Sequence, residues 1–216
     1  MKQTMKECML QQPATIQAVI EGAPEQLRRV SRAIGEGPFE KVYLIGSGTS
    51  LHAAIAARYA MSEWLGIEAQ VFTPFEFLNY FPHRRLNERT LVLGVSQTAR
   101  STGTIHCMEL CQQWRAKTVF VTAEPENPGA KSAQVVLNTC TGQELVGAKT
   151  KGFTSTIAML LLYAAHLAKR PLTLAQVPAW METTLANTSA VIEALAEEYK
   201  DAPSVTIVGG GTLTAA

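Results

Sequence analysis

The chain has 216 residues, which is more than one typical domain and less than two. Its 19 Lys and Arg residues nearly balance its 18 Asp and Glu residues, and this net charge of +1 argues against a nucleic-acid binder. Apolar residues make up 47% of the chain, enough for a sizeable core, but no uncharged apolar run is long enough to span a membrane. The amino terminus has no apolar signal segment, so we expect a soluble cytoplasmic protein with no membrane partner.

The expected elements begin with a helix at 13–34, which the Gly22-Ala-Pro24 segment is predicted to divide into two shorter helices. Five short apolar runs bounded by glycine, proline or polar residues predict strands at 41–45, 69–73, 90–95, 117–122 and 133–139. Amphipathic segments predict helices at 50–65, 74–80, 101–114 and 154–168. This alternation indicates an α/β fold, a three-layer α/β/α sandwich around a five-stranded parallel sheet of the flavodoxin-like type.

The last part of the chain has a different pattern. Apolar spacing predicts a long helix over 173–199, and Val205–Val208 with its three following glycines resembles Val42–Ile45 with its glycine turn. We therefore expect three parts: a first domain at 1–170, a connecting helix at 171–203, and the start of a second, similar domain at 204–216. That second domain would stop at Ala216, after its first strand and glycine turn.

The four cysteines show no spacing that is typical of a metal site or a redox pair. Cys107 and Cys111 lie four residues apart on one face of an expected helix, while Cys8 and Cys140 stand alone. We expect small buried side chains at all four positions. No His, Asp or Glu cluster has metal spacing either, so the sequence predicts neither a metal nor another cofactor.

The loop after the first strand has the chemistry of an anion site. Gly48 lets the backbone approach a ligand, and Thr49 and Ser50 add hydroxyl groups where a helix begins and its free N–H groups point outward. A dinucleotide site is disfavoured, because Leu51 occupies the position of the third fingerprint glycine and no acidic residue closes the second strand.

The loop after the third strand is a second candidate anion site. It is rich in hydroxyl and amide side chains and carries one cation, and its candidate residues are Ser96, Gln97, Thr98, Arg100 and Ser101. The alternative is a plain turn in which Ser101 or Thr102 caps the following helix. Because ligands bind at the carboxyl ends of parallel strands, the two loops together favour a binding site.

The loop after the fifth strand adds Gly147 and Lys149 as candidates. It is not a P-loop, because Ala148 separates Gly147 from Lys149 and the loop follows the wrong strand. Glu144 is the one candidate for a catalytic carboxylate. It could be a base, a hydroxyl acceptor or the ion-pair partner of Lys149, and the structural role is favoured over the catalytic one.

Taken together, these loops resemble the sugar isomerase (SIS) domain family of phosphosugar-binding proteins. The resemblance rests on four ordered segments: Met5–Pro13, Gly48–Ala53, Ser96–Ser101 and Glu144–Phe153. The first is similar to the segment that opens the isomerase half of glucosamine-6-phosphate synthases. The resemblance covers about residues 5–170 and implies the same sandwich fold.

The resemblance also implies roles for residues. Ser50, Ser96, Gln97, Thr98 and Ser101 would hold the phosphate, and 147–149 would border the sugar. The chain departs from the family pattern at Ala99-Arg100, where glycine and glutamate are common, at Val146-Gly147, where glycine precedes valine, and at Lys149, where serine is common. The two added positive side chains, Arg100 and Lys149, predict a ligand with a second anionic group.

The activity implied by the resemblance is that of an aldose–ketose isomerase or deglycase acting on amino-sugar or glycated-amine 6-phosphates. Such enzymes move a proton between C1 and C2 with a carboxylate base. Relatives with two SIS domains take these groups largely from the second domain and a neighbouring subunit, so we expect a homodimer and little or no activity from this chain alone. The alternative is the non-catalytic phosphosugar sensor of a regulator, although the stretch before Gly35 is too short for a DNA-binding helix-turn-helix.

Overall fold

The computed structural model describes residues 3–215, and its centre is a sheet of five parallel strands. The strands lie in the order β2-β1-β3-β4-β5, which is the flavodoxin-like order. Their bounds are β1 Lys41–Gly46, β2 Glu68–Phe72, β3 Thr90–Val95, β4 Lys117–Thr122 and β5 Val135–Asn138. The predicted fold class is therefore confirmed.

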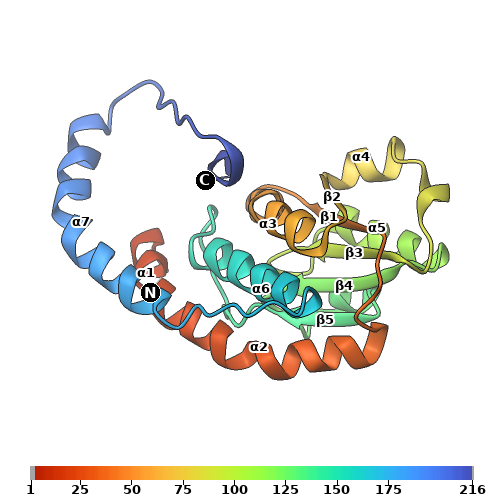
Figure 1. Ribbon diagram of the computed structural model, residues 1–216. Helices are drawn as coiled ribbons and strands as arrows, with labels where there is room; N and C mark the ends of the chain where they lie inside the picture. The colour runs from red at the N-terminus through yellow and green to blue at the C-terminus, as the bar shows by residue number, and fades with distance from the viewer. Residues whose placement is uncertain (1–2, 216) are drawn as a thin grey trace.

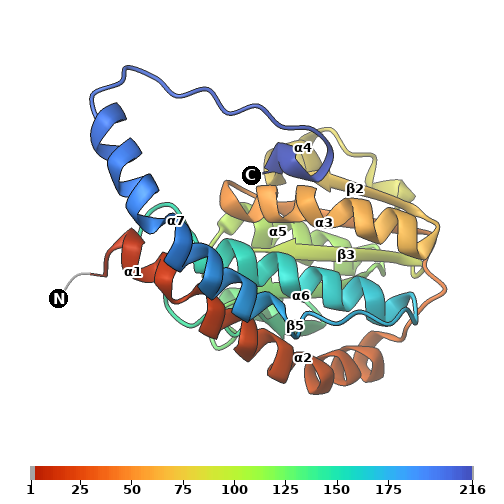
Figure 2. The ribbon, with the colours of Figure 1, turned by 60° about the vertical axis from the view of Figure 1, so that its left-hand side comes forward.

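Helices cover both faces of the sheet (Figures 1 and 2). Helices α2, α3 and α6 pack on one face, and α4 and α5 pack on the other. Their bounds are α1 Met5–Leu10, α2 Gln12–Ile34, α3 Thr49–Leu65, α4 Pro74–Asn79, α5 Thr102–Gln113, α6 Lys151–Leu167 and α7 Val177–Tyr199. Short 3-10 turns lie at η1 His83–Arg85, η2 Pro128–Ser132 and η3 Gly211–Ala215.

The central strands show why the apolar runs are continuous. Side chains alternate between the two faces of a strand, so Val42 and Leu44 of β1 enter one hydrophobic cluster while Tyr43 and Ile45 enter the other. All four are at most 2% exposed. A strand buried on both faces needs apolar residues at every position, and this distinguishes it from the half-exposed strand of an antiparallel sheet.

The strand order also fixes where a ligand site can form. β1 and β3 are neighbours, but β1 leads into α3 on one face and β3 leads into α5 on the other. The two connections diverge from adjacent strand ends and leave a crevice at the carboxyl edge of the sheet.

One sequence prediction about the helices was wrong. α2 runs without interruption from Gln12 to Ile34, although Pro24 lies inside it. Ala23 and Leu27 on either side are buried, at 2% and 7% exposure, against the core. Packing of this apolar face outweighs the one backbone hydrogen bond that Pro24 cannot donate.

The predicted carboxyl-terminal helix is present as α7, but the strand predicted at 205–208 is not formed. Val205, Ile207 and Val208 are 76%, 77% and 90% exposed, because no neighbouring strand lies there to pair with them. The segment then turns back, and η3 lies against α3 (Figure 2). The division into domains stays a prediction, and Ala216 lies outside the described residues.

Candidate functional site

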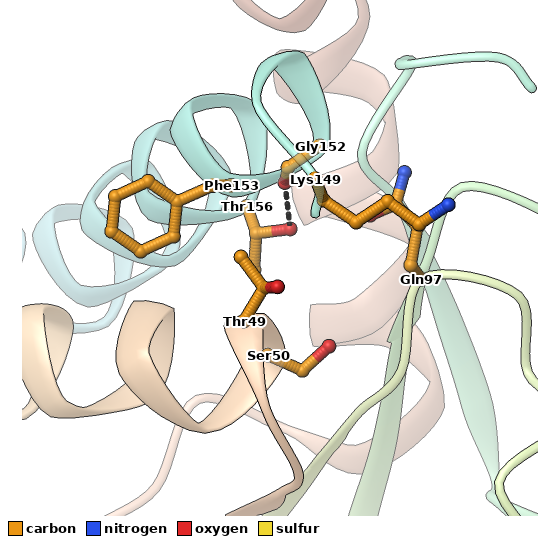
Figure 3. Close-up of a pocket in the computed structure, with 7 residues that line it drawn as sticks. All are labelled: Thr49, Ser50, Gln97, Lys149, Gly152, Phe153 and Thr156. Atoms are coloured by element: carbon orange, nitrogen blue, oxygen red, sulfur yellow. Dashed lines mark hydrogen bonds between the residues drawn. The ribbon is translucent and has the colours of Figure 1, made fainter. Parts of the chain in front are cut away.

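A small pocket lies at the carboxyl edge of the sheet, where the starts of α3 and α6 meet the loop after β3 (Figure 3). Seven residues line it: Thr49, Ser50, Gln97, Lys149, Gly152, Phe153 and Thr156. They come from the ends of β1, β3 and β5 and from the helices that follow. The three loops singled out in the sequence therefore do meet at one place.

The pocket is narrow. Its volume is about 170 Å³ when the space open to solvent is included, and about 10 Å³ is accessible to the centre of a water molecule. That is room for roughly one enclosed water. A ligand larger than this must extend out of the pocket or displace the loop at 142–149.

Glycines let α3 begin close to the sheet. A Cβ atom at Gly46 would lie 3.1 Å from both the Leu51 nitrogen and the Val95 oxygen. Gly48, the N-cap residue, has a φ of 55°, and no side chain caps the helix there. The Ser50 nitrogen already donates to the Ser47 carbonyl oxygen at 3.2 Å, so what α3 offers an anion beside Thr49 and Ser50 is the positive end of its dipole and the two hydroxyl groups.

Gln97 is held by its backbone while its side-chain nitrogen is unpartnered. Its carbonyl oxygen accepts hydrogen bonds from the Ala123 nitrogen at 3.0 Å and from Thr122 Oγ1 at 3.1 Å. Its Nε2 atom is buried and has no hydrogen-bond partner in residues 3–215. Gly152 makes room for this amide, because a Cβ atom there would lie 2.6 Å from Nε2.

The rest of the loop after β3 points away from the pocket. Ala99 is buried with a φ of 50°, and this turn directs Arg100 outward. The Arg100 side chain is 69% exposed and pairs with Glu124 at 3.3 Å, so it lies outside the pocket lining, and its contact with a ligand stays a prediction.

The hydroxyl residues of this loop do not line the pocket either. Ser96 is buried, and Ser101 is the N-cap residue of α5 without a side-chain capping bond. The Ser101 oxygen accepts a hydrogen bond from Thr104 Oγ1 at 3.0 Å. Thr98 likewise lies outside the pocket lining. Ligand binding by these three residues therefore stays a prediction.

The loop after β5 holds the Lys149 side chain at the pocket through hydrogen bonds to main-chain carbonyl groups of the same loop. Lys149 Nζ donates to the carbonyl oxygens of Glu144 and Val146, and the bond to Val146 is 2.8 Å long. Lys149 forms no ion pair with a carboxylate in the described residues. Gly147 is exposed, with open space around it, and does not line the pocket.

Glu144 also lies outside the lining, with its carboxylate turned toward the start of α6. Oε1 accepts hydrogen bonds from the Thr150 nitrogen at 2.8 Å and from Thr150 Oγ1 at 3.0 Å, and Oε2 accepts one from the Gly152 nitrogen at 2.9 Å. The carboxylate is therefore not the ion-pair partner of Lys149.

The lining residues give the pocket a clear chemical character. Their polar groups are hydroxyls, one amide and one ammonium, and none of the seven carries a carboxylate. Hydroxyl, amide and ammonium groups beside a helix N-terminus suit a phosphate group. None of the seven supplies the carboxylate that commonly acts as base in a proton transfer at carbon.

The cysteines play no part in the pocket. Cys8, Cys107 and Cys111 are buried and Cys140 is half-buried, so the expected packing role is confirmed for three of them. Burial raises the pKa of the Cys107 thiol to about 12. Within residues 3–215, no three His, Cys, Asp or Glu side chains gather to form a metal site, and no helix is long and apolar enough to cross a membrane.

Sequence reasoning missed three lining residues: Gly152, Phe153 and Thr156. The first two lie inside the Glu144–Phe153 segment, in a stretch that the pattern assigns to the loop and not to the following helix. α6 begins at Lys151 and not at the predicted residue 154. The earlier start places the first turn of α6 at the pocket.

The comparisons with known proteins agree with this geometry. The SIS domain family pattern matches residues 39–166. A glutamine–fructose-6-phosphate aminotransferase (isomerizing) from Gloeobacter violaceus is 31% identical over 184 residues, which is 80% of this chain and 30% of that protein. The chain therefore spans about a third of the length of the curated relatives it matches.

Solved structures show the same fold. The C-terminal domain of glucosamine-fructose-6-phosphate aminotransferase from Francisella tularensis matches with a TM-score of 0.75 and 17% identity, over 91% of this chain and 59% of that one. The tagatose-6-phosphate ketose/aldose isomerase from Escherichia coli matches with a TM-score of 0.71 and 16% identity, over 97% of this chain and 60% of that one.

Proposed function

The chain belongs to the SIS domain family, and from this membership we propose that its pocket binds the phosphate group of a sugar phosphate. Thr49, Ser50 and Gln97 would hold the phosphate at the positive end of the α3 dipole. The names of the relatives support this ligand class, because several of them act on fructose 6-phosphate or tagatose 6-phosphate.

The unpartnered Gln97 Nε2 is the observation that carries the proposal. A buried amide nitrogen without an acceptor costs about 1–3 kcal/mol in the unliganded protein. A phosphate oxygen in the pocket would supply that acceptor. The hydroxyls of Thr49 and Ser50 lie in the same lining and would donate to the same group.

Calorimetric titration with fructose 6-phosphate tests the proposal, with fructose and NAD as comparison ligands. We expect binding of fructose 6-phosphate and none of fructose, because the hydroxyl, amide and ammonium groups of the lining suit a phosphate and fructose has none. Ser50→Ala should weaken binding about 10-fold, the loss of one hydrogen bond to a charged group. Binding of NAD without binding of any sugar phosphate would contradict the proposal.

For the reaction, we propose that the chain is part of an aldose–ketose isomerase or deglycase. This chain alone would be inactive or weakly active. The supporting observation is that no carboxylate lines the pocket and that the carboxylate oxygens of Glu144 are engaged by α6. The base would come from outside this chain, as in a homodimer or a further domain. Incubation with fructose 6-phosphate should give no aldose product above background by proton NMR.

For the substrate, we propose an amino-sugar or glycated-amine 6-phosphate with a second anionic group. Lys149 supports this, since its ammonium lines the pocket without a carboxylate partner in the described residues. Arg100 no longer supports it, because it pairs with Glu124. Lys149→Gln should weaken a carboxylate-bearing adduct more than fructose 6-phosphate, and equal losses for both would contradict the second anion.

The second candidate is a non-catalytic phosphosugar sensor, and the missing carboxylate is the observation that favours it. A sensor and an enzyme lacking its base would bind the same ligand. They differ when the remaining acid/base groups are supplied. A relative's second SIS domain, added to this chain, should restore isomerisation if the chain is part of an enzyme and should leave it inactive if the chain is a sensor.

A further inference from the structure

Glu144 lies behind the pocket in an unusual arrangement. Its side chain is 5% exposed, and its carboxylate oxygens accept three hydrogen bonds, all from the first turn of α6. Thr150, the N-cap residue of that helix, makes no capping bond with its own side chain. A carboxylate from six residues earlier therefore does the capping, and as an anion it also suits the positive end of the helix dipole.

Two lining residues depend on this one glutamate. Its carboxylate fixes the Gly152 nitrogen, and Gly152 is the residue against which the Gln97 amide lies. The main-chain carbonyl oxygen of Glu144 accepts a hydrogen bond from Lys149 Nζ. Glu144 thus acts on the pocket from both ends, through its side chain toward α6 and through its main chain toward Lys149.

The amino-terminal segment closes the other side of this loop. The Leu145 nitrogen donates to Gln3 Oε1 at 2.8 Å, and Lys151 Nζ donates to Gln11 Oε1 at 2.9 Å. Lys151 is 7% exposed and forms no ion pair within residues 3–215. Gln11 is its one side-chain partner there, so the burial of this ammonium depends on where α1 and α2 meet.

Cys8 of α1 completes the contact. It is fully buried, and burial followed by the nearby Glu144 carboxylate raises the pKa of its thiol. The small neutral side chain leaves the carboxylate without a competing charge from α1.

We infer that Glu144 is a positioning residue of the pocket, and that the amino-terminal segment holds its loop in place through the bonds of Gln3 to Leu145 and of Gln11 to Lys151. The inference rests on the proposed function, since it concerns the affinity of that same site. It gives the amino-terminal helix, which lines no part of the pocket, a role in ligand binding. Glu144 itself makes no contact with the ligand.

Glu144→Gln tests the charge and the acceptors while keeping the shape. A glutamine side chain offers one carbonyl oxygen and one NH₂ group, so either the Thr150 or the Gly152 N–H faces another donor. We expect fructose 6-phosphate to bind at least 10-fold more weakly by calorimetry. The measurement is made well below the melting temperature of each variant, so that the protein is folded.

Glu76→Gln is the matched control. Glu76 Oε2 accepts from the Thr73 nitrogen at 3.0 Å and from Thr73 Oγ1 at 2.8 Å, the same kinds of donor, but it caps α4 away from the pocket lining. A purely structural capping role would lower the melting temperature of both variants and leave both affinities at the wild-type value. The inference expects loss of affinity in Glu144→Gln alone.

A second pair of variants covers the case in which Glu144→Gln does not fold. Gln11→Ala removes the acceptor of Lys151, and Leu10→Ala changes a neighbouring side chain that is 53% exposed and faces α7. We expect Gln11→Ala to weaken binding at least threefold and Leu10→Ala to leave it unchanged. Wild-type affinity in both Glu144→Gln and Gln11→Ala would overturn the inference alone. Failure of the wild-type protein to bind any hexose 6-phosphate would instead overturn the proposed function, and this inference with it.

Discussion

Two buried side-chain atoms in residues 3–215 have no hydrogen-bond partner, and they lie in very different regions. Tyr163 OH is in the middle of α6, packed in the hydrophobic core between the helices and the sheet. Gln97 Nε2 lies in the pocket at the edge of the sheet. The same local defect therefore has two meanings, since only the Gln97 amide lies at a pocket whose other polar groups suit an anion.

A buried polar atom without a hydrogen-bond partner is destabilising in both regions. Only at Gln97 would a bound ligand supply the missing partner. Desolvation raises the pKa of Tyr163 well above its usual value, as expected for a hydroxyl enclosed by apolar groups. Gln97 would recover its hydrogen bond on binding an anion. The comparison separates a packing defect from a binding group. Three predictions test that separation, and a fourth concerns the amino-terminal cap.

The largest expected effect is on ligand affinity at Gln97. Gln97→Leu keeps much of the side-chain volume but removes the amide, so fructose 6-phosphate should bind about 10- to 100-fold more weakly, the loss of a hydrogen bond to a charged group. Stability in the absence of ligand should be unchanged or higher, because an unsatisfied donor is removed. Calorimetry and thermal unfolding measure the two quantities. Unchanged affinity would show that Gln97, like Tyr163, is only an unsatisfied buried group and does not bind the ligand.

The next effect concerns the loop that carries Gln97. A Cβ atom at Gly129 would lie 2.0 Å from the Ala99 carbonyl oxygen, so Gly129→Ala must displace the turn at Ala99. We expect the free energy of unfolding to fall by about 1–3 kcal/mol and affinity to fall with it.

Gly210→Ala is the matched control for this prediction, because a Cβ atom there meets nothing within 4 Å. Urea unfolding and calorimetry of both variants give the comparison. Equal stability of the two variants would show that the contact between Gly129 and Ala99 does not hold the loop.

A smaller effect is expected in the core. Tyr163→Phe removes the unpartnered hydroxyl and keeps the ring, so the free energy of unfolding should stay within about 1 kcal/mol of wild type or rise. Affinity for fructose 6-phosphate should not change. Loss of affinity in this variant would contradict the division between the two regions.

The smallest effect is on pH dependence near α1. Hydrogen bonds from the Thr4 nitrogen and hydroxyl lower the pKa of the exposed Glu7 carboxyl below 4.5. A lowered pKa in the folded state contributes stability above pH 4.5, and this contribution is lost as the pH falls through the folded value. Thr4→Ala should therefore flatten slightly the fall of melting temperature as the pH is lowered below 4.5. An identical profile would show that the cap contributes nothing.

Much of the fold could be predicted from the sequence, because continuous apolar runs between amphipathic segments leave few alternatives to a parallel sheet. The exceptions have physical causes. α2 continues through Pro24 because its buried face outweighs one missing bond. Val205–Val208 has the pattern of a strand, but a strand needs a neighbour to pair with, and the pattern alone cannot supply one.

The candidate site was predicted less completely. Thr49, Ser50, Gln97 and Lys149 do line one pocket, as the positions of three loops on a parallel sheet indicate. The outward direction of Arg100 follows from the positive φ of Ala99, which no pattern in the sequence predicts. The structural role favoured for Glu144 stays a prediction, and its contacts with Thr150 and Gly152 follow only from the start of α6 at Lys151.

The most direct measurement of the central claim follows the side-chain amide of Gln97 itself by proton–nitrogen NMR, with the resonance assigned by its loss in Gln97→Leu. Binding of a phosphate to the pocket predicts that this resonance shifts in a saturable way with fructose 6-phosphate and stays in place with fructose. An unmoved resonance at saturating fructose 6-phosphate would contradict the claim that this pocket holds the phosphate.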